Sequence, residues 1–458
     1  MKTLISTNPG KNYQNIGEVR ISTLKEIKNK VAKANSAKLM WKELGVRRRT
    51  EIIRPVLEEF TERRKEIIGM IIKEIGKTFK DAEMEIDRYS NDFKWFLENG
   101  EHSLKEEVTY EDDKTIHRIV YEPYGTVAVI TPWNHPFGMF VWGVIPNLIA
   151  GNTVVWKISE ECPLTGKIIE EIMLSKNLPD GVFSEVYGAG DTGKQLINQD
   201  VNLIWFTGSS KVGKEVYRTA AKKFIKVILE MGGSNPGIIF EDVDADQFID
   251  KIYAKRFRNC GQSCDALKRL LIHESIFDDI VNKLKRKIEE KIVGDPENPD
   301  TETGSLVAER QLKLLEEQVN DAVKKGAKII TGGRKPDNLK GAYYMPTILT
   351  NISKNMRVWN EEVFGPVLIV HKFKTEDEAV ELANDTKYGL GSLVFTNDKK
   401  RAHRVASRLE TGTVEINSAI HWFTCNPFGG YKESGMGREH GKHGFHELCQ
   451  IKVISEEK

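Results

Sequence analysis

The chain has 458 residues, of which 40% are hydrophobic and 29% charged, a composition ordinary for a globular protein. With 68 basic and 67 acidic side chains the formal net charge is +1, which excludes the extended basic surface that nucleic-acid binding needs. The N-terminal segment lacks the apolar stretch of a signal peptide, and the longest apolar run, residues 137–150, is too short to span a bilayer. We therefore expect about two or three domains and neither a membrane nor a nucleic-acid partner.

Cysteine usage points to an intracellular protein. The cysteines are scattered, without a CxxC pair, at five positions: Cys162, Cys260, Cys264, Cys425 and Cys449. An odd and dispersed set predicts neither a disulfide framework nor a zinc site, so no metal is expected. It fits a reducing cytoplasm and a single working thiol.

The first hundred residues are predicted to be helical. Ile53, Val56, Leu57 and Phe60 recur at the spacing of one helix face. A second set of the same kind comprises Ala82, Ile86, Tyr89, Phe93 and Phe96. Each set predicts an amphipathic helix that packs against a core.

The pattern changes after residue 121. Short runs rich in β-branched residues predict strands at 127–131, 153–157, 183–187, 203–207 and 227–230. Stretches of helical length lie between them, at 137–150, 163–176, 192–198 and 211–223. This alternation is typical of a parallel sheet with crossover helices, and a dinucleotide-binding open sheet is the natural candidate.

A second α/β pattern follows from about residue 237. Its predicted strands are residues 270–273, 328–331, 367–370, 392–395 and 412–417, and residues 309–325 form one of the charged helices between them. The sequence thus predicts two α/β domains, with a cleft between them built from the loops around 230–264.

The strongest chemical signal is the segment Asn259-Cys260-Gly261-Gln262-Ser263-Cys264. A lone cysteine beside glycine is usually a small buried hydrophobe. Four further segments accompany this one, at residues 131–136 (TPWNHP), 206–213 (FTGSSKVG), 229–236 (LEMGGSNP) and 361–366 (EEVFGP). In this order and spacing, the five segments resemble the aldehyde dehydrogenase superfamily over nearly the whole chain.

The resemblance implies a fold with three parts. These are a Rossmann-like NAD(P)-binding domain at residues 1–230, an α/β catalytic domain at 231–420, and a return segment at 421–458. A small β oligomerisation arm is expected where residues 115–126 meet the strand-like residues 449–455. A homodimer or homotetramer follows from the resemblance alone.

The chemistry of aldehyde oxidation gives three residues a role. A nucleophile must make the carbonyl carbon tetrahedral, and a thiolate does this best near neutral pH. In the family the nucleophile follows Gly-Gln-x, which selects Cys264 over Cys260. The amide of Asn134, with the backbone N–H of Cys264, is expected to hold the oxyanion. Glu230, at a strand end, is expected to activate the water that hydrolyses the thioester.

The cofactor is expected at the ends of the first strands. Gly208 and Ser209 open a helix, and helix N–H groups can face a pyrophosphate. By resemblance, Lys157 and Glu160 reach the adenosine ribose, and Glu362 and Phe364 the nicotinamide side. Trp133 and Gly213 belong to the same motifs and complete the expected cofactor set. A carboxylate such as Glu160 repels a 2′-phosphate, so NAD is the leading cofactor, with NADP left open by Lys157.

Another glycine motif, residues 188–193 (GAGDTG), matches the GxGxxG pattern. It follows the third predicted strand rather than the first, and the family does not use this loop as its pyrophosphate clamp. We assign it at most a loop role near the adenine.

The substrate is less well determined. The GGSNP form of the Glu230 segment and the ending at residues 443–449 look most like the succinate-semialdehyde dehydrogenase group. Two departures stand out: Ser234 occupies a position that is lysine in most relatives, and Trp142 replaces the arginine that pairs with the substrate carboxylate in that group. His135 also replaces a common phenylalanine. An aromatic pocket is predicted instead, from Phe137, Trp142, Trp422 and Phe423.

Several functions therefore remain open. Succinic semialdehyde and an apolar or aromatic aldehyde are equally supported as substrates. A CoA-acylating dehydrogenase would keep the cysteine but usually lack the general base, and Glu230 argues against it. A non-catalytic scaffold would be expected to lose the thiol, the amide or the base, and all three are present.

Overall fold

The chain begins with a β-hairpin, where the sequence had predicted helix. In the computed structural model, which describes residues 2–458, β1 (Thr3–Asn8) pairs antiparallel with β2 (Gln14–Arg20). The 3-10 turn η1 (Pro9–Lys11) joins them, and the Asn8 side chain accepts hydrogen bonds from its first backbone N–H groups. The prediction of helix from residue 1 is wrong here because proline and the Asn8 cap end the extended run in a tight turn.

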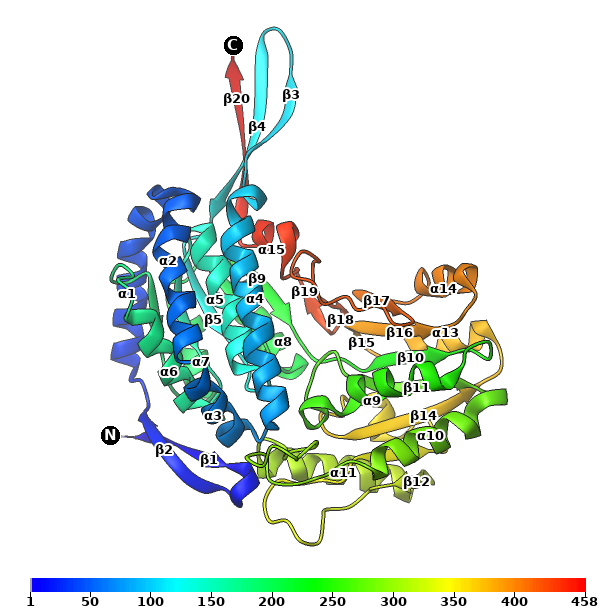
Figure 1. The fold of residues 1–458 in the computed structure, drawn as a ribbon. Coiled ribbons are helices and arrows are strands. Elements are labelled where there is room, and N and C mark those ends of the chain that lie inside the picture. The colour runs from blue at the N-terminus through cyan, green and yellow to red at the C-terminus, as the bar shows by residue number, and fades with distance from the viewer. Residues whose placement is uncertain (1) are drawn as a thin grey trace.

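Four helices follow the hairpin and stand beside the first sheet (Figure 1). They are α1 (Leu24–Glu43), α2 (Gly45–Glu62), α3 (Arg64–Ile75) and α4 (Phe79–Ser103). A capping box between Thr23 and Glu26 starts α1, and the Thr78 side chain caps α4. The apolar faces predicted from the sequence lie in α2 and α4, and both are buried.

The first sheet is parallel apart from its edge and has the order β19-β9-β8-β5-β6-β7. Its parallel strands are β5 (Thr126–Ile130), β6 (Thr153–Lys157), β7 (Phe183–Glu185), β8 (Leu203–Thr207) and β9 (Lys226–Glu230). The crossover helices are α5 (Pro136–Ala150), α6 (Pro163–Leu174), α7 (Gly190–Ile197) and α8 (Ser210–Lys223). The register pairs Thr207 with Glu230, so the carboxyl ends of β8 and β9 meet at one edge. The predicted dinucleotide-binding architecture is confirmed.

A second sheet of mixed direction forms the other half of the body, in the order β12-β13-β14-β11-β10-β16-β17. Its strands are β10 (Asn235–Ile239), β11 (Leu267–His273), β12 (Lys328–Thr331), β13 (Thr347–Thr350), β14 (Val367–Phe373), β16 (Gly391–Phe395) and β17 (Thr413–Ile416). Only β12 runs antiparallel to its neighbour.

Six α-helices and three short 3-10 helices belong to this half. The α-helices are α9 (Ile249–Phe257), α10 (Phe277–Glu289), α11 (Glu309–Lys324), α12 (Arg357–Asn360), α13 (Glu376–Asn384) and α14 (Lys399–Ala406). The 3-10 helices are η2 (Ala245–Gln247), η3 (Arg258–Gly261) and η4 (Glu274–Ile276). The charged helix expected at 309–325 is thus α11.

The C-terminal segment returns across the molecule. After β17, the strand β18 (Tyr431–Lys432) pairs with β15 (Tyr388–Gly389), and β19 (Gly435–Met436) joins the edge of the first sheet beside β9. The helix α15 (Gly441–Glu447) then leads into β20 (Cys449–Glu457). One short stretch of chain therefore contacts both halves before it leaves the body.

A three-stranded arm projects from the body (Figure 1). It has the order β20-β4-β3, with β3 (Glu107–Glu111) and β4 (Thr115–Pro123), and β20 pairs antiparallel along the whole of β4. The two segments that were predicted to meet in an arm, residues 115–126 and 449–455, pair as β4 and β20. Its role in assembly, and the domain boundaries at residues 230 and 420, stay predictions.

Within residues 2–458, no helix combines the length and the apolar character that a membrane crossing requires.

Candidate active site

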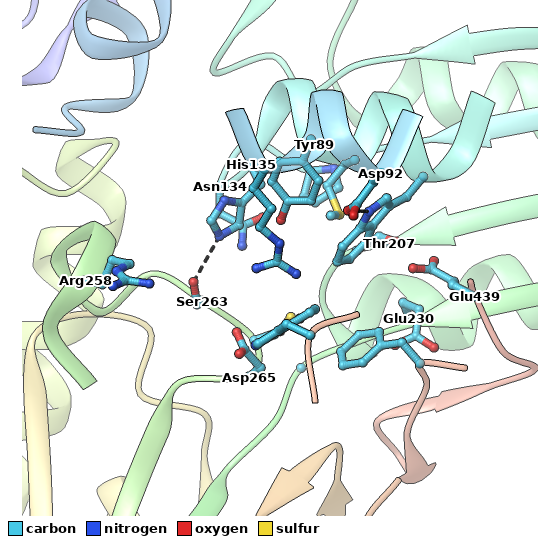
Figure 2. A pocket seen from close by; sticks show the side chains of 18 of the residues that line it. Tyr89, Asp92, Asn134, His135, Thr207, Glu230, Arg258, Ser263, Asp265 and Glu439 are labelled. Atoms are coloured by element: carbon cyan, nitrogen blue, oxygen red, sulfur yellow. Dashed lines mark hydrogen bonds between the residues drawn. The ribbon is translucent and has the colours of Figure 1, made fainter. Parts of the chain in front are cut away.

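A cavity of about 910 Å³ lies where the carboxyl edge of the first sheet faces the second sheet. Its walls come from the ends of β8 and β9, the start of α5, one face of α4, and the loops around residues 263–265 and 420–428. Figure 2 shows Glu230 and Glu439 side by side, across the cavity from Asn134 and His135. Ligands of open α/β sheets bind at such a strand edge.

Cys264 lies half-buried in the wall of this cavity, three residues after η3 ends. Its carbonyl oxygen accepts hydrogen bonds from the Asn235 side-chain amide at 3.0 Å and from the Lys268 ammonium at 3.2 Å. These two bonds fix the backbone that carries the thiol. Burial, together with the neighbouring Asp265 carboxylate, raises the pKa of the Cys264 thiol well above its usual value.

Cys260, the competing thiol, is fully buried and lines no part of the cavity. Burial raises its pKa to about 12, so it remains a thiol under ordinary conditions. The choice of Cys264 over Cys260 therefore has a physical basis in access to the cavity.

Asn134 lies in the loop between β5 and α5 and faces the same cavity. Its side-chain amide donates to the carbonyl oxygen of Gln262 at 3.2 Å, and its own carbonyl accepts from the Asn259 side chain at 2.9 Å. The second bond ties the Asn134 backbone to the loop that carries Cys264. One amide hydrogen therefore remains available to a bound oxyanion.

Glu230 is the last residue of β9, and its carboxyl group is buried at the cavity edge. Neither of its oxygens has a hydrogen-bond partner within residues 2–458. Burial raises the pKa of Glu230 well above its ordinary value, against a weaker opposing effect of Arg438. The Glu439 carboxyl group is buried as well, and its pKa is also raised, by burial and by the proximity of Glu230.

A buried polar network supports the opposite wall. His135 Nε2 lies 3.0 Å from the hydroxyl of Ser263, and His135 Nδ1 lies 3.1 Å from the Lys77 ammonium. Burial, with the Lys77 charge, lowers the pKa of His135, so the ring is neutral at neutral pH. Because an ammonium can only donate, Nδ1 accepts from Lys77 and Nε2–H donates to Ser263, the residue before Cys264.

The same network carries a buried ion pair at the start of α5. Lys77 contacts Glu85, and both side chains are 1% exposed. Glu85 also accepts hydrogen bonds from the backbone N–H groups of Phe137 at 3.0 Å and Gly138 at 3.3 Å. Burial favours the neutral acid, but the charge of Lys77 outweighs this effect and the pKa of Glu85 is held at about 2. Glu85 thus caps a helix that lacks a side-chain cap of its own.

Replacing Glu85 with alanine is expected to destabilise the protein by about 3–5 kcal/mol, because the Lys77 ammonium would remain buried without its partner. Denaturant unfolding followed by tryptophan fluorescence measures this loss. The matched control is Glu101→Ala, which breaks the Arg47–Glu101 pair, whose side chains are 76% and 60% exposed. That change should cost less than about 1 kcal/mol. Equal losses in the two variants would contradict a structural role for the buried pair.

Five of the predicted cofactor residues line the cavity: Trp133, Gly208, Ser209, Glu362 and Phe364. The Trp133 and Phe364 rings meet edge to face at 5.4 Å. A Cβ on Gly232 would lie 2.2 Å from a Glu362 carboxylate oxygen, so only glycine admits Glu362 at this position.

The other three predicted cofactor residues lie outside this cavity. Lys157 ends β6 and is buried, with Glu160 at 3.8 Å. Gly213 lies in α8, where a Cβ would meet the Met231 sulfur at 2.2 Å. The GxGxxG segment runs from the end of β7 into α7, and a Cβ on Gly193 would contact the Lys157 side chain at 3.5 Å. Lys157, Glu160 and Gly213 therefore lie near the carboxyl edge of the first sheet but outside the cavity.

Three of the four residues predicted to form an aromatic pocket line the cavity. Trp142 and Trp422 both line the cavity and stack with ring centroids 5.7 Å apart. Phe423 lines the mouth and is 58% exposed. The Trp142 indole N–H donates to Asp92 at 2.8 Å.

The assignment of Phe137 to the pocket is wrong. Phe137 is fully buried in the core and packs edge to face on Phe60 of α2 at 5.1 Å. Along α5 the cavity is lined by Met139 and Trp142, which lie on one face of the helix. Phe137 is two residues from Met139 and so points about 200° around the helix from it.

Several polar residues of the site were not found by sequence reasoning. Lys268 donates to the Gly233 carbonyl at 2.6 Å and to Glu362, next to the position where Ser234 replaces a lysine. The serine at position 234, where most relatives have lysine, was the signal in the sequence that a lysine from elsewhere, Lys268, lies here. Arg88 and Asp92 also line the cavity, from α4. Arg88 follows Glu85 by three residues and Asp92 follows Tyr89 by three, and this helical spacing was the signal that could have found them.

A ligand cavity at the carboxyl edge of a parallel sheet, with a thiol in its wall, fits the class of nicotinamide-dependent oxidoreductases. The chain belongs to the aldehyde dehydrogenase family, whose model matches residues 2–454. It is 36% identical to a betaine aldehyde dehydrogenase of Bacillus subtilis, over 90% of this chain and 86% of the relative. It is 35% identical to an NADP-dependent succinate-semialdehyde dehydrogenase of Deinococcus radiodurans, over 94% and 90%.

A solved structure agrees with the fold over almost the whole chain. Betaine aldehyde dehydrogenase from Staphylococcus aureus, in complex with NAD+, superimposes with a TM-score of 0.94 at 34% identity, covering 99% of this chain and 91% of that one. The protein is therefore an NAD(P)-dependent oxidoreductase that acts on small-molecule aldehydes.

Proposed function

We propose that this protein oxidises an aldehyde to a free carboxylic acid through a thioester on Cys264, which a water activated by Glu230 then hydrolyses. One observation carries the proposal: a half-buried thiol and a buried carboxyl group without hydrogen-bond partners in residues 2–458 line the same cavity. Each group has the chemistry that one half of the reaction needs.

In the first half, the Cys264 sulfur adds to the carbonyl carbon of the aldehyde. The C–S bond forms as the carbonyl π electrons move to oxygen, and the thiol proton leaves to the surrounding water. The resulting oxyanion is stabilised by the Asn134 amide and the Cys264 backbone N–H. The Asn134 amide has a second N–H beside the one that it donates to Gln262, so it can bind the oxyanion without losing that bond.

The residues present fit a nicotinamide dinucleotide. Glu362 enters the cavity only because residue 232 is glycine, and Trp133 and Phe364 form an aromatic corner beside it. We assign the nicotinamide side to Trp133, Glu362 and Phe364. The phosphates are assigned to Gly208, Ser209 and Gly213 at the start of α8, and the adenosine ribose to Lys157 and Glu160. When bound, the oxidised nicotinamide supplies the hydride acceptor of the reaction.

In the second half, Glu230 takes a proton from water while the water oxygen adds to the thioester carbonyl. The C–S bond then breaks with its electron pair on sulfur, the carboxylic acid leaves, the Cys264 thiolate takes up a proton from water, and Glu230 releases its proton to water. A base with a raised pKa holds the proton well enough to generate hydroxide near neutral pH. The presence of this base favours hydrolysis over transfer of the acyl group to coenzyme A.

For the substrate we propose succinic semialdehyde first, in keeping with the likeness to that group. An apolar or aromatic aldehyde is the second candidate, because the stacked Trp142 and Trp422 line the cavity.

The projecting arm supports assembly into a homodimer or homotetramer, since the outer strand β20 exposes Ile451, Val453 and Ile454. The absence of cysteine pairing within residues 2–458 supports a reducing compartment such as the cytoplasm.

The initial rate of NAD(P)H formation with a panel of aldehydes, each tested with NAD and NADP, tests the proposal. We expect turnover without coenzyme A, with one free carboxylic acid released for each NAD(P)H formed. Succinic semialdehyde, butanal and benzaldehyde represent the charged, apolar and aromatic classes. A strict requirement for coenzyme A, or no turnover with any aldehyde, would contradict the proposed reaction.

A further inference from the structure

Arg88 brings an unpaired positive charge into the cavity. It lies on α4, is half-buried, and lines the same cavity as Cys264. Its guanidinium carbon lies 4.0 Å from the centre of the Trp422 ring and 5.1 Å from that of Tyr89. The ion pairs and hydrogen bonds of residues 2–458 include none to Arg88, whose guanidinium instead contacts the rings of Tyr89, Trp142 and Trp422.

The other cations of the cavity have acidic partners. Lys251 and Lys255 both pair with the buried Glu415, at 3.0 and 2.8 Å. Arg258, whose side chain is exposed, lies 3.8 Å from Asp81. Their charges are therefore compensated before any ligand arrives.

The acids of the cavity do not compensate Arg88 either. Asp92 accepts hydrogen bonds from the Trp142 indole at 2.8 Å and from the Thr424 hydroxyl at 2.5 Å. Asp265 lies 3.9 Å from Lys255. Burial raises the pKa of both Glu230 and Glu439, which favours their neutral forms. Arg88 is thus the cation of this wall that no carboxylate holds in a direct ion pair, within the part of the chain that the structure describes.

We propose that Arg88 determines substrate specificity by binding a carboxylate at the end of the substrate remote from the aldehyde. This inference rests on the proposed function and names its substrate class. A guanidinium held over an aromatic face keeps its N–H donors free at its edge, in the fork that matches a carboxylate. Arg88 takes the place of the arginine that is missing at Trp142, and Trp142 and Trp422 form the apolar walls beside it.

The same geometry disfavours cationic aldehydes. A quaternary ammonium or amine is recognised by the faces of aromatic rings, and Arg88 already occupies the face of Trp422. A second cation in this position would meet like charge at close range. The arrangement therefore selects among aldehydes of similar size by the sign of their remote charge.

The test compares kcat/KM for succinic semialdehyde with that for butanal, which has the same number of carbons and no charge. In Arg88→Gln, we expect the ratio of the two values to fall about 10- to 100-fold, mainly through a higher KM for the charged substrate. Arg88→Lys keeps the charge but loses the fork and should recover part of the ratio. The matched control is Lys94→Gln, which removes an exposed charge from the same helix and should leave the ratio unchanged.

A measurement on the unaltered protein makes the test independent of any variant's folding. The methyl ester of succinic semialdehyde removes the charge and keeps the chain, and its kcat/KM should be about 10-fold or more below that of the acid. An unchanged ratio in Arg88→Gln, a fall only in Arg258→Gln, or equal use of acid and ester would overturn the role of Arg88. Any of these, together with oxidation of butanal to butyric acid, leaves the proposed function intact. If the unaltered protein releases no acid from any of these aldehydes, the proposed function fails first.

Discussion

Replacing Cys264 with alanine is expected to reduce kcat by between about 10⁴- and 10⁶-fold, the scale on which covalent catalysts lose activity without their nucleophile. The reason is that, within residues 2–458, the two other thiols near the site are poorly placed to form the thioester. Cys425 lines the outer part of the cavity and is exposed, whereas Cys260 is buried behind the wall. Steady-state NAD(P)H formation, with acid release followed in parallel, measures the loss.

The matched controls are Cys260→Ala and Cys425→Ser. Both should retain most of the turnover, and the one thiol that substrate protects from a thiol reagent should disappear only in the Cys264 variant. Titration with a thiol reagent in the presence and absence of substrate distinguishes these cases. If Cys260→Ala were as inactive as Cys264→Ala while keeping its thermal stability, the assignment of the nucleophile would be wrong.

Replacing Glu230 with glutamine is expected to separate the two halves of the reaction. Hydride release should continue for one turnover, whereas steady-state kcat should fall about 10²- to 10⁴-fold because no base remains to activate water. Rapid mixing should then show a burst of one NAD(P)H per active site, and intact-mass measurement should detect the acyl group on the chain. The absence of both a burst and an acyl adduct would contradict hydrolysis by Glu230.

The control for this change is Glu185→Gln. Glu185 ends β7 in the same sheet, is buried, and also has a raised pKa because of burial, but it lies outside the cavity. Its replacement should leave steady-state turnover nearly unchanged. A loss of activity equal to that of Glu230→Gln would indicate a general effect of buried acids at this edge.

The pH dependence of hydrolysis follows from the raised pKa of Glu230. Below this pKa the carboxyl group carries its proton and cannot act as a base, so the rate of acid release should rise as the pH increases through it. The acidic limb of the kcat profile should lie well above the ordinary range of a glutamate, and it should vanish in Glu230→Gln. A limb near pH 4 would contradict the buried environment of this group.

The first sheet could be predicted from sequence because its strands are continuous β-branched runs separated by helices of regular length. Such runs are characteristic of parallel strands buried on both faces. The N-terminal hairpin could not be predicted in the same way, because Thr3–Asn8 and Gln14–Arg20 are short, partly polar strands at the molecular surface. Their pairing depends on a turn and on packing against α3.

The site was predicted in part for a similar reason. Cys264, Asn134 and Glu230 lie in segments whose local sequence is distinctive, and the structure brings them to one cavity. Phe137 was misassigned because α5 is apolar on every side, so nothing in its sequence marks the face that meets the cavity. Arg88 was overlooked because a charged residue on a helix usually faces solvent. Arg88 lies in a pocket because the loop that carries Trp422, which is distant in sequence, packs over it.

The pairing of β19 with β9 has a consequence for how this protein is made. Gly435 pairs with Glu230, and the segments on either side of this pair place Phe428 and Glu439 at the cavity wall. A nascent chain still emerging from the ribosome therefore carries the nucleophile and most of the sheet, but the surroundings of its base are incomplete. Synthesis must therefore run past Glu439 before the enzyme can turn over. A transcript cut short, or a protease that trims the tail, should leave a chain that can capture an aldehyde without efficiently releasing it.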